Sequence, residues 1–282
     1  MAKTILEIAR NAILLAGFDA PTSLLTPSQH YDIAHYRAII QSVGEDLAAR
    51  FNWAALLKTY QFTTTPSVAY YKLPKDCSRI AHNTIWDDSI NDWMDSPMNI
   101  QTFALEQFDP ITSGTTYRFA MKGLGAIELV PTPTDAITFK FKYLSTNWIV
   151  PIEWQPSISV SEGQYVRYGY NIYTAVGAGA TGSTPPTHTS GSVSDGSITW
   201  AYHDDAYVSI VSDDDNVCVD ELALESGIIS RIKEGLDQPN QIDEARYIAR
   251  GKRGFGHQSI SKNLRMFGNP RRSRLPMIVD FE

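Results

Sequence analysis

Apolar and polar positions along the first 57 residues follow the period of an α-helix. A Thr4-x-x-Glu7 capping box opens the first helical stretch, and Gly17 stands where that helix would end. Thr26-Pro27-Ser28-Gln29 predicts the N-terminus of a second, longer helix, with Thr26 as the N-cap and Pro27 as the first helical residue. The residues expected to face inward are Ile5, Ile8, Ala9, Ala12, Leu15 and Ala16 in the first helix, and Ile33, Tyr36, Ile40, Val43, Leu47 and Phe51 in the second.

The period changes after Trp53, where short β-branched and aromatic runs are separated by Pro, Gly, Asn and Asp. Apolar and polar residues alternate strictly in Ile137–Tyr143, which predicts a strand with one buried and one wet face. We therefore expect an antiparallel β-domain, a sandwich or a curled sheet, over residues 58–150. Its predicted strands are Lys58–Thr65, Tyr70–Leu73, Thr116–Phe119, Ala126–Val130 and Ile137–Tyr143.

Residues 151–206 differ in composition, being rich in Gly, Ser, Thr, Tyr and Pro. Strands are expected around Gln164–Ala175 and Ser197–Tyr202, with a long loop over Val176–Ser194 between them. A core of about 55 residues rarely supplies more than ~3–5 kcal/mol of stability by itself. We interpret this stretch as an inserted small β-module that leans on its host or on a neighbouring subunit.

Helical periodicity returns over residues 207–250. Ser212–Asp215 is typical of a helix N-terminus, because acidic side chains favour the positive end of the helix dipole. A shorter helix is expected over Gln241–Arg250, with Gly251–Glu282 as an extended arm. The predicted fold class is α+β: a helical bundle formed by 1–57 and 207–250, an antiparallel β-sandwich, the inserted module and the arm. The inward face of the first C-terminal helix is expected to be Cys218, Leu222, Ile229, Ile232 and Leu236.

The net charge is −7, yet basic residues are concentrated near the C-terminus, with nine and no acidic residue from Ala245 to Arg274. Two interpretations remain open for this region: a disordered solubilising tail, or an arm that docks on a protein or passes near nucleic acid. The apolar segment Leu275–Phe281 favours protein docking, because an extended segment can add to the edge of a sheet. The arm residues expected to dock are Arg250, Lys252, Arg253, Lys262, Arg265, Arg271, Arg272, Arg274, Met277, Ile278, Val279 and Phe281.

Sequence signatures of catalysis are scarce. The glycine-broken run Gly251–Gly256 lacks the spacing of a nucleotide loop, and the histidines and cysteines never form paired zinc-ligand spacings. Cys77 with His82 is a weak nucleophile–base pair, and Asp87–Asp95 lacks the glycine and terminal glutamate of a calcium loop. We therefore expect no catalytic residue, no metal site, no cofactor and no enzymatic activity. The two cysteines fit folding in a reducing cytoplasm, and no stretch has the ~20 apolar residues that span a bilayer.

Aromatic residues are dense in the insertion. Two interpretations are open: a platform on which sugars stack, or the core of a small module, which is the favoured one. The candidate glycan contacts are Tyr168, Tyr170, Tyr173 and Trp200.

The order of these parts resembles the head-to-tail adaptors of short-tailed bacteriophages, relatives of the tail tubular A protein. Tyr71–Ile80 is similar to the family's LP-x-D-x-x-R-I strand and turn. Further similarity lies in Tyr117-Arg118, Ala126–Leu129, Pro131–Pro133, Phe141–Tyr143 and the acid-started helix from Asp213 to Asp237. The insertion departs from the smaller family members and resembles a carbohydrate-binding β-module of phage structural proteins, through Tyr173–Ala175, Gly182, Pro185-Pro186, Asp195-Gly196 and Trp200.

The resemblance implies a structural protein at the head–tail junction of a virion. It would form a ring, usually of twelve subunits, under the portal protein, extend the channel for double-stranded DNA, and carry the tail tube or nozzle. The C-terminal arm would reach the portal, and an acidic body would let DNA pass without trapping it. The alternatives are a glycan-binding virion or surface protein acting through the insertion, and an enzyme on cell-wall glycan, which needs a carboxylate pair in a cleft.

Overall fold

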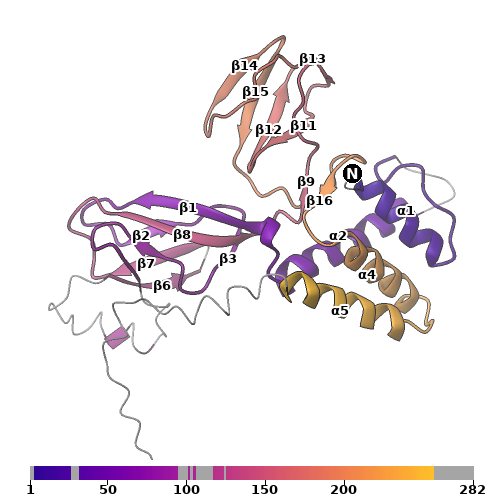
Figure 1. Cartoon of the computed structure of the whole chain (residues 1–282), viewed down its shortest axis with the longest axis horizontal. Helices are drawn as coiled ribbons and strands as arrows, with labels where there is room; N and C mark the ends of the chain where they lie inside the picture. Colours follow the sequence, from indigo (N-terminus) through magenta and orange to yellow (C-terminus); the bar gives the residue numbers. More distant parts are fainter. Residues whose placement is uncertain are drawn as a thin grey trace, which may run out of the picture.

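The computed structural model describes residues 3–26, 32–94, 101, 104–105, 117–123 and 125–256. In this part of the chain the fold is a mixture of helices and antiparallel sheets, which confirms the predicted α+β class. The helices are α1 (Ile5–Leu15), α2 (Ile33–Arg50), α4 (Glu221–Glu234) and α5 (Gln241–Gly256), with a short 3-10 turn, η1 (Ala54–Leu56), after α2. Figure 1 shows α1, α2, α4 and α5 together, with β1–β8 (between residues 57 and 145) in one region and β11–β15 (between residues 165 and 203) in another, while β9 (Ile149–Val150) and β16 (Asn216–Val217) lie beside the helices.

The first helix forms as its sequence predicts. Thr4 caps α1, since its hydroxyl accepts a hydrogen bond from the Glu7 amide and the Glu7 carboxylate accepts one from the Thr4 amide. Gly17 follows the end of the helix with a φ of 93°, a conformation that glycine adopts without strain. Leu15 is an exception to the predicted inward face, because its side chain is 64% exposed and Ile13 is buried in its stead.

The second helix begins later than predicted. Asp32 caps α2 through a hydrogen bond from the His35 amide, so the prediction that Thr26 is the N-cap is wrong. The rest of the predicted start, residues 27–29, lies outside the described residues. The inward face is confirmed for Ile33, Ile40, Val43, Leu47 and Phe51, whereas Tyr36 is only half-buried.

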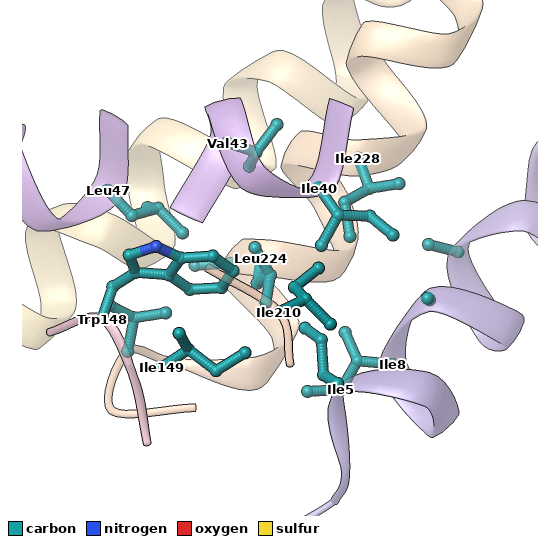
Figure 2. Close-up of a cluster of buried hydrophobic side chains, with 14 of the residues drawn as sticks. Ile5, Ile8, Ile40, Val43, Leu47, Trp148, Ile149, Ile210, Leu224 and Ile228 are labelled. Carbon is teal, nitrogen blue, oxygen red and sulfur yellow. The ribbon is translucent and has the colours of Figure 1, made fainter. Parts of the chain in front are cut away.

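A buried tryptophan, Trp148, lies at the centre of the contacts between the helices. Trp148, which follows the β-domain, is fully buried and donates an indole hydrogen bond of 3.0 Å to the Val208 carbonyl. Gly44 on α2 faces the indole so closely that any side chain there would collide with the ring. Figure 2 shows the indole among apolar side chains from α1, α2 and α4. Labelled around it are Ile5, Ile8, Ile40, Val43, Leu47, Ile149, Ile210, Leu224 and Ile228.

The described residues of the β-region after η1 form two antiparallel sheets. In the first, β8 (Thr138–Ser145) pairs with β1 (Leu57–Thr63), β3 (Cys77–Ile80) and β4 (Trp86–Asp87), and β4 pairs with β5 (Asp92–Trp93). In the second, β7 (Ala126–Val130) lies between β2 (Tyr70–Lys72) and β6 (Arg118–Lys122). The predicted alternation in β8 is confirmed, because Phe139, Phe141 and Tyr143 are buried and the lysines between them are not. Both sheets contribute to one cluster of buried side chains.

The insertion has a core of its own. Its main sheet has the order β11-β12-β15-β14, and β10 (Ser159–Val160) pairs with β13 (Gly179–Ala180). The four strands are β11 (Tyr165–Tyr168), β12 (Asn171–Val176), β14 (Ser192–Asp195) and β15 (Ile198–His203). Figure 1 shows this sheet standing away from the helices, joined to them near β9 (Ile149–Val150) and β16 (Asn216–Val217), which pair with each other. The predicted loop over Val176–Ser194 therefore contains β13 and most of β14.

The acidic run Asp213–Asp215 does not begin a helix, contrary to the prediction. Helix α4 begins after Asp220, whose carboxylate accepts from the Ala223 amide. The run instead meets the start of α1, where the carbonyls of Asp215 and Asp213 accept from the amides of Ile5 and Leu6. The Asp215 carboxylate is buried and accepts from the Tyr207 hydroxyl at 3.1 Å. Burial raises the pKa of Asp215, although hydrogen bonds from the Ser212 and Val211 amides oppose the rise.

Candidate assembly surfaces

Four polar side chains form a cluster where the β-region leaves the helical core, here called the Asp76 cluster. The Asp76 carboxylate accepts hydrogen bonds from the Lys58 ammonium at 2.7 Å, the Ser145 hydroxyl at 2.6 Å and the Tyr143 hydroxyl at 2.9 Å. Burial alone would raise the pKa of Asp76, but Lys58 and the two hydroxyls outweigh burial and lower it. The cluster joins β1 to β8 and to the turn before β3.

Arg79 on β3 fixes the sheet to the end of α2. Its guanidinium donates to the carbonyls of Ala49 and Phe51 and to the side chain of Asn52, at 2.6, 3.3 and 2.5 Å. These carbonyls end the helix, where a cation also meets the negative end of the helix dipole. The aspartate and the arginine of the Tyr71–Ile80 motif therefore both serve the junction between helices and sheet.

Helix α5 presents a basic outer face. Its inner side packs mainly on α4 and also reaches the C-terminal end of α2, where the Tyr247 hydroxyl donates to the Asp46 carboxylate and Gly251 lies against the Phe51 ring. Burial and the Asp46 carboxylate raise the pKa of Tyr247. Arg246, Lys252 and Arg253 are exposed on the other side, and Arg250 is half-buried.

The prediction that the extended arm starts at Gly251 is wrong, because α5 continues to Gly256. Lys252 and Arg253 are therefore helical residues. The other predicted docking residues lie outside the described part of the chain; these are Lys262, Arg265, Arg271, Arg272, Arg274, Met277, Ile278, Val279 and Phe281.

Several large apolar side chains of the helical core face solvent. On α1 and just after it, Leu14 and Leu15 are more than half exposed and Phe18 is partly exposed. Leu236 and Ile242, in and after the α4–α5 turn, are 45% and 70% exposed. Exposed apolar groups of this size mark candidate contact surfaces.

The predicted inward face of α4 is wrong at Leu222 and Leu236, because both side chains are exposed. Cys218, also predicted on this face, precedes the helix.

The aromatic residues of the insertion mostly build its core. Tyr173 and Trp200 are fully buried, so the prediction that they contact a glycan is wrong. The indole groups of Trp200 and Trp154 both donate to one oxygen of the buried Asp195 carboxylate, at 3.1 and 3.2 Å. Tyr168 and Tyr170 are exposed, so the glycan-binding interpretation retains these two residues.

The candidates for catalysis and metal binding are Cys77 with His82 and the run Asp87–Asp95, of which Asp87 and Asp92 pair across β4 and β5 and Asp95 lies outside the described residues. Burial, assisted by the Asp76 carboxylate, raises the pKa of Cys77 to about 12, so its thiol is protonated at neutral pH. Within the described residues, no three or more His, Cys, Asp or Glu side chains gather with the geometry of a metal site. Nor does any helix of this part of the chain have the length and apolar character to cross a membrane.

The sequence profile of the SU10 adaptor protein family matches residues 4–173. This stretch contains α1, α2, the Asp76 cluster, Arg79 and the first strands of the insertion. It thus continues past Phe141–Tyr143, the last N-terminal segment named above for the family resemblance, and stops before α4 and α5. A search of curated proteins yields no match. Because the profile covers more than half of the 282 residues, this chain belongs to the SU10 adaptor protein family, whose role is that of a structural phage adaptor in the virion.

Proposed function

We propose that the protein is a head-to-tail adaptor that forms a ring under the portal of a phage head. The ring extends the channel through which double-stranded DNA leaves, and its lower face carries the tail tube or nozzle. Family membership over residues 4–173 is the observation that carries this proposal. A ring of twelve subunits is the expectation taken from the related head-to-tail adaptors.

Two features of the helical core support ring formation. A closed ring needs two different patches on each subunit, because every contact is heterologous. The exposed apolar side chains on and just after α1 and those around the α4–α5 turn are two candidate patches for such a contact. We propose that these two patches face each other across the subunit boundary.

The basic outer face of α5 supports docking on the portal. Arg246, Arg250 and Arg253 recur at a spacing that places them along one side of the helix. They precede residues 257–282, which include most of the predicted docking residues. The net charge of the chain as a whole is −7, so this concentration of positive charge stands out as a site for an acidic partner surface.

The copy number of the protein in purified particles tests the ring. Quantitative mass spectrometry of labelled peptides should return one copy for each portal subunit. Absence from particles, or a ratio far from one, would remove the adaptor proposal. A tail fibre or decoration protein of known stoichiometry, measured in the same digest, is the control.

A truncation after Gly256 tests portal docking by residues 257–282. It must not begin at Gly251, because Gly251 packs against Phe51 in the helical core. The truncated protein should keep the melting temperature of the full chain and lose co-sedimentation with purified portal. Undiminished co-sedimentation would overturn the assignment of the arm.

A further inference from the structure

A groove of about 820 Å³ opens where the helical core, the β-region and the insertion meet. Leu56 of η1 and Val217 of β16 form its helical side, and Ser145 belongs to β8. Arg167 and Tyr170, at the end of β11 and in the turn that follows, belong to the insertion. The volume is in the range of specific binding sites, and the lining combines an apolar wall with polar side chains, among them the charged groups of Lys58, Glu153 and Arg167.

Arg167 is poorly satisfied in this groove. Its guanidinium makes one hydrogen bond within the described residues, to Glu153 at 3.4 Å, and Glu153 itself is largely exposed. The Nε atom of Arg167 is buried and has no acceptor. An unsatisfied buried N–H group carries a desolvation cost, and a carboxylate that binds to Arg167 would remove this cost by accepting the hydrogen bond. The planar guanidinium can donate two parallel hydrogen bonds to such a carboxylate.

The other cation of the groove is already neutralised. Lys58 belongs to the Asp76 cluster, so Arg167 carries the positive charge that remains for a ligand. Burial raises the pKa of Cys218, which also lines the groove, and the charges of Arg167 and Lys58 oppose the rise. The side chains of Arg167 and Lys58 therefore both lie close enough to Cys218, within this groove, to influence its pKa.

We propose that this groove binds an extended peptide segment of the tail protein, in which a carboxylate side chain stands beside apolar ones. The carboxylate pairs with Arg167 and the apolar side chains cover the apolar wall. This inference rests on the proposed adaptor function. Nucleic acid fits less well, because one available cation beside the Glu153 carboxylate and an apolar wall offers little to a phosphate backbone.

The position of the groove favours the tail protein over the portal. Figure 1 shows α5 on the side of the helical core that faces away from the insertion, whereas the groove is lined by insertion residues. A ring subunit whose α5 faces the portal would thus present the groove to a different neighbour.

Photo-crosslinking in assembled virions tests the proposal. A benzoylphenylalanine is placed at Tyr170, which is 71% exposed on the rim, and the matched control carries it at Val176. Val176 is exposed at the far end of β12, about 20 Å along the strand. Irradiation should join position 170, and not position 176, to a tail-protein peptide that contains Asp or Glu beside apolar residues.

Substitutions at the ion pair sharpen the test. Arg167→Gln should lower the crosslinked fraction at position 170 about tenfold or more, and Arg167→Lys should lower it less. Glu153→Gln should leave it equal or higher, because it removes the competing carboxylate. Crosslinks from position 170 to DNA, to the portal or to another copy, equal yields at 170 and 176, no crosslink at all, or an unchanged yield in Arg167→Gln would each overturn the groove assignment.

The same particles separate the two proposals. A normal copy number without the tail crosslink overturns the groove assignment and leaves the adaptor function standing. Absence of the protein from particles overturns both.

Discussion

Arg79 on β3 donates a hydrogen bond of 2.6 Å to the carbonyl oxygen of Ala49 in the last turn of α2. The two residues are 30 positions apart and belong to different parts of the fold. Through this contact the last turn of a helix and the edge of a sheet hold a fixed relative position. In an adaptor ring, this contact would fix the orientation of each β-region relative to the helices of its own subunit.

Arg79→Ala should destabilise the fold by about 2 kcal/mol, because it leaves the Ala49 and Phe51 carbonyls and the Asn52 side chain without their charged donor. Urea unfolding at pH 7 measures the change. Arg246→Ala is the matched control, since the Arg246 side chain is exposed and its ion pair with Asp243 is long. Equal losses in the two variants would contradict the role of Arg79.

Lys58→Met should change how stability depends on pH. In the wild-type chain the pKa of Asp76 lies below its ordinary value of 3.8, so this group stabilises the fold above that pH and the contribution is lost as pH falls further. Without Lys58, burial raises the pKa of Asp76, and the sign reverses: stability rises as pH is lowered from 7 toward 4. At pH 7 the variant should lose about 3 kcal/mol.

Urea unfolding of wild type and Lys58→Met at pH 4, 5, 6 and 7 provides the measurement. The difference in free energy of unfolding between the two proteins should shrink toward pH 4. A difference that stays constant over this range would show that Lys58 does not set the pKa of Asp76.

Asp195→Ala should unfold the insertion and leave the rest of the chain folded. It removes the acceptor of two buried indole N–H groups, and each unsatisfied group costs about 1–3 kcal/mol. A module of this size has only ~3–5 kcal/mol to lose. Hydrogen exchange should therefore speed up in β11, β12 and β15 and stay slow in α2 and α4. Ser194→Ala, an exposed neighbour on β14, should leave both regions protected.

The sequence pattern was enough to predict an element where the residues of that element alone determine its structure. The capping box and Gly17 fix the two ends of α1, and strict alternation fixes β8, since burial of every second side chain is a local property of a strand. In the insertion, the two predicted strand regions contain β11, β12 and β15, whereas β10, β13 and β14 were not predicted. The motif from Tyr71 to Ile80 contains Asp76 and Arg79, which hold the sheet to the helices, but the spacing of the motif does not predict which residues these two side chains contact.

Two of the wrong predictions have the same physical cause, namely contacts between residues distant in sequence. The run Asp213–Asp215 looks like a helix start, but its carbonyls meet the amides at the start of α1, about 200 residues away in the chain. The helical period does not by itself give the width of the buried stripe of α1, since the adjacent Ala12 and Ile13 are both buried whereas Leu14 and Leu15 are both exposed. The aromatic side chain of Tyr173 could stack on a sugar, but its strand, β12, lies between β11 and β15 in a four-stranded sheet.

Ile242→Asp should remove the protein from particles without unfolding it. The Ile242 side chain is 70% exposed, so the charge costs little in the free subunit, whereas burial at a subunit boundary would desolvate it. Since a ring repeats each contact, a loss of about 2 kcal/mol at one patch weakens every boundary. Val176→Asp is the matched control, because Val176 is an apolar residue on the insertion that is also more than half exposed, and it should be incorporated normally. Copy number relative to the portal, measured in purified particles, decides; normal incorporation of Ile242→Asp would exclude this patch from the ring contact.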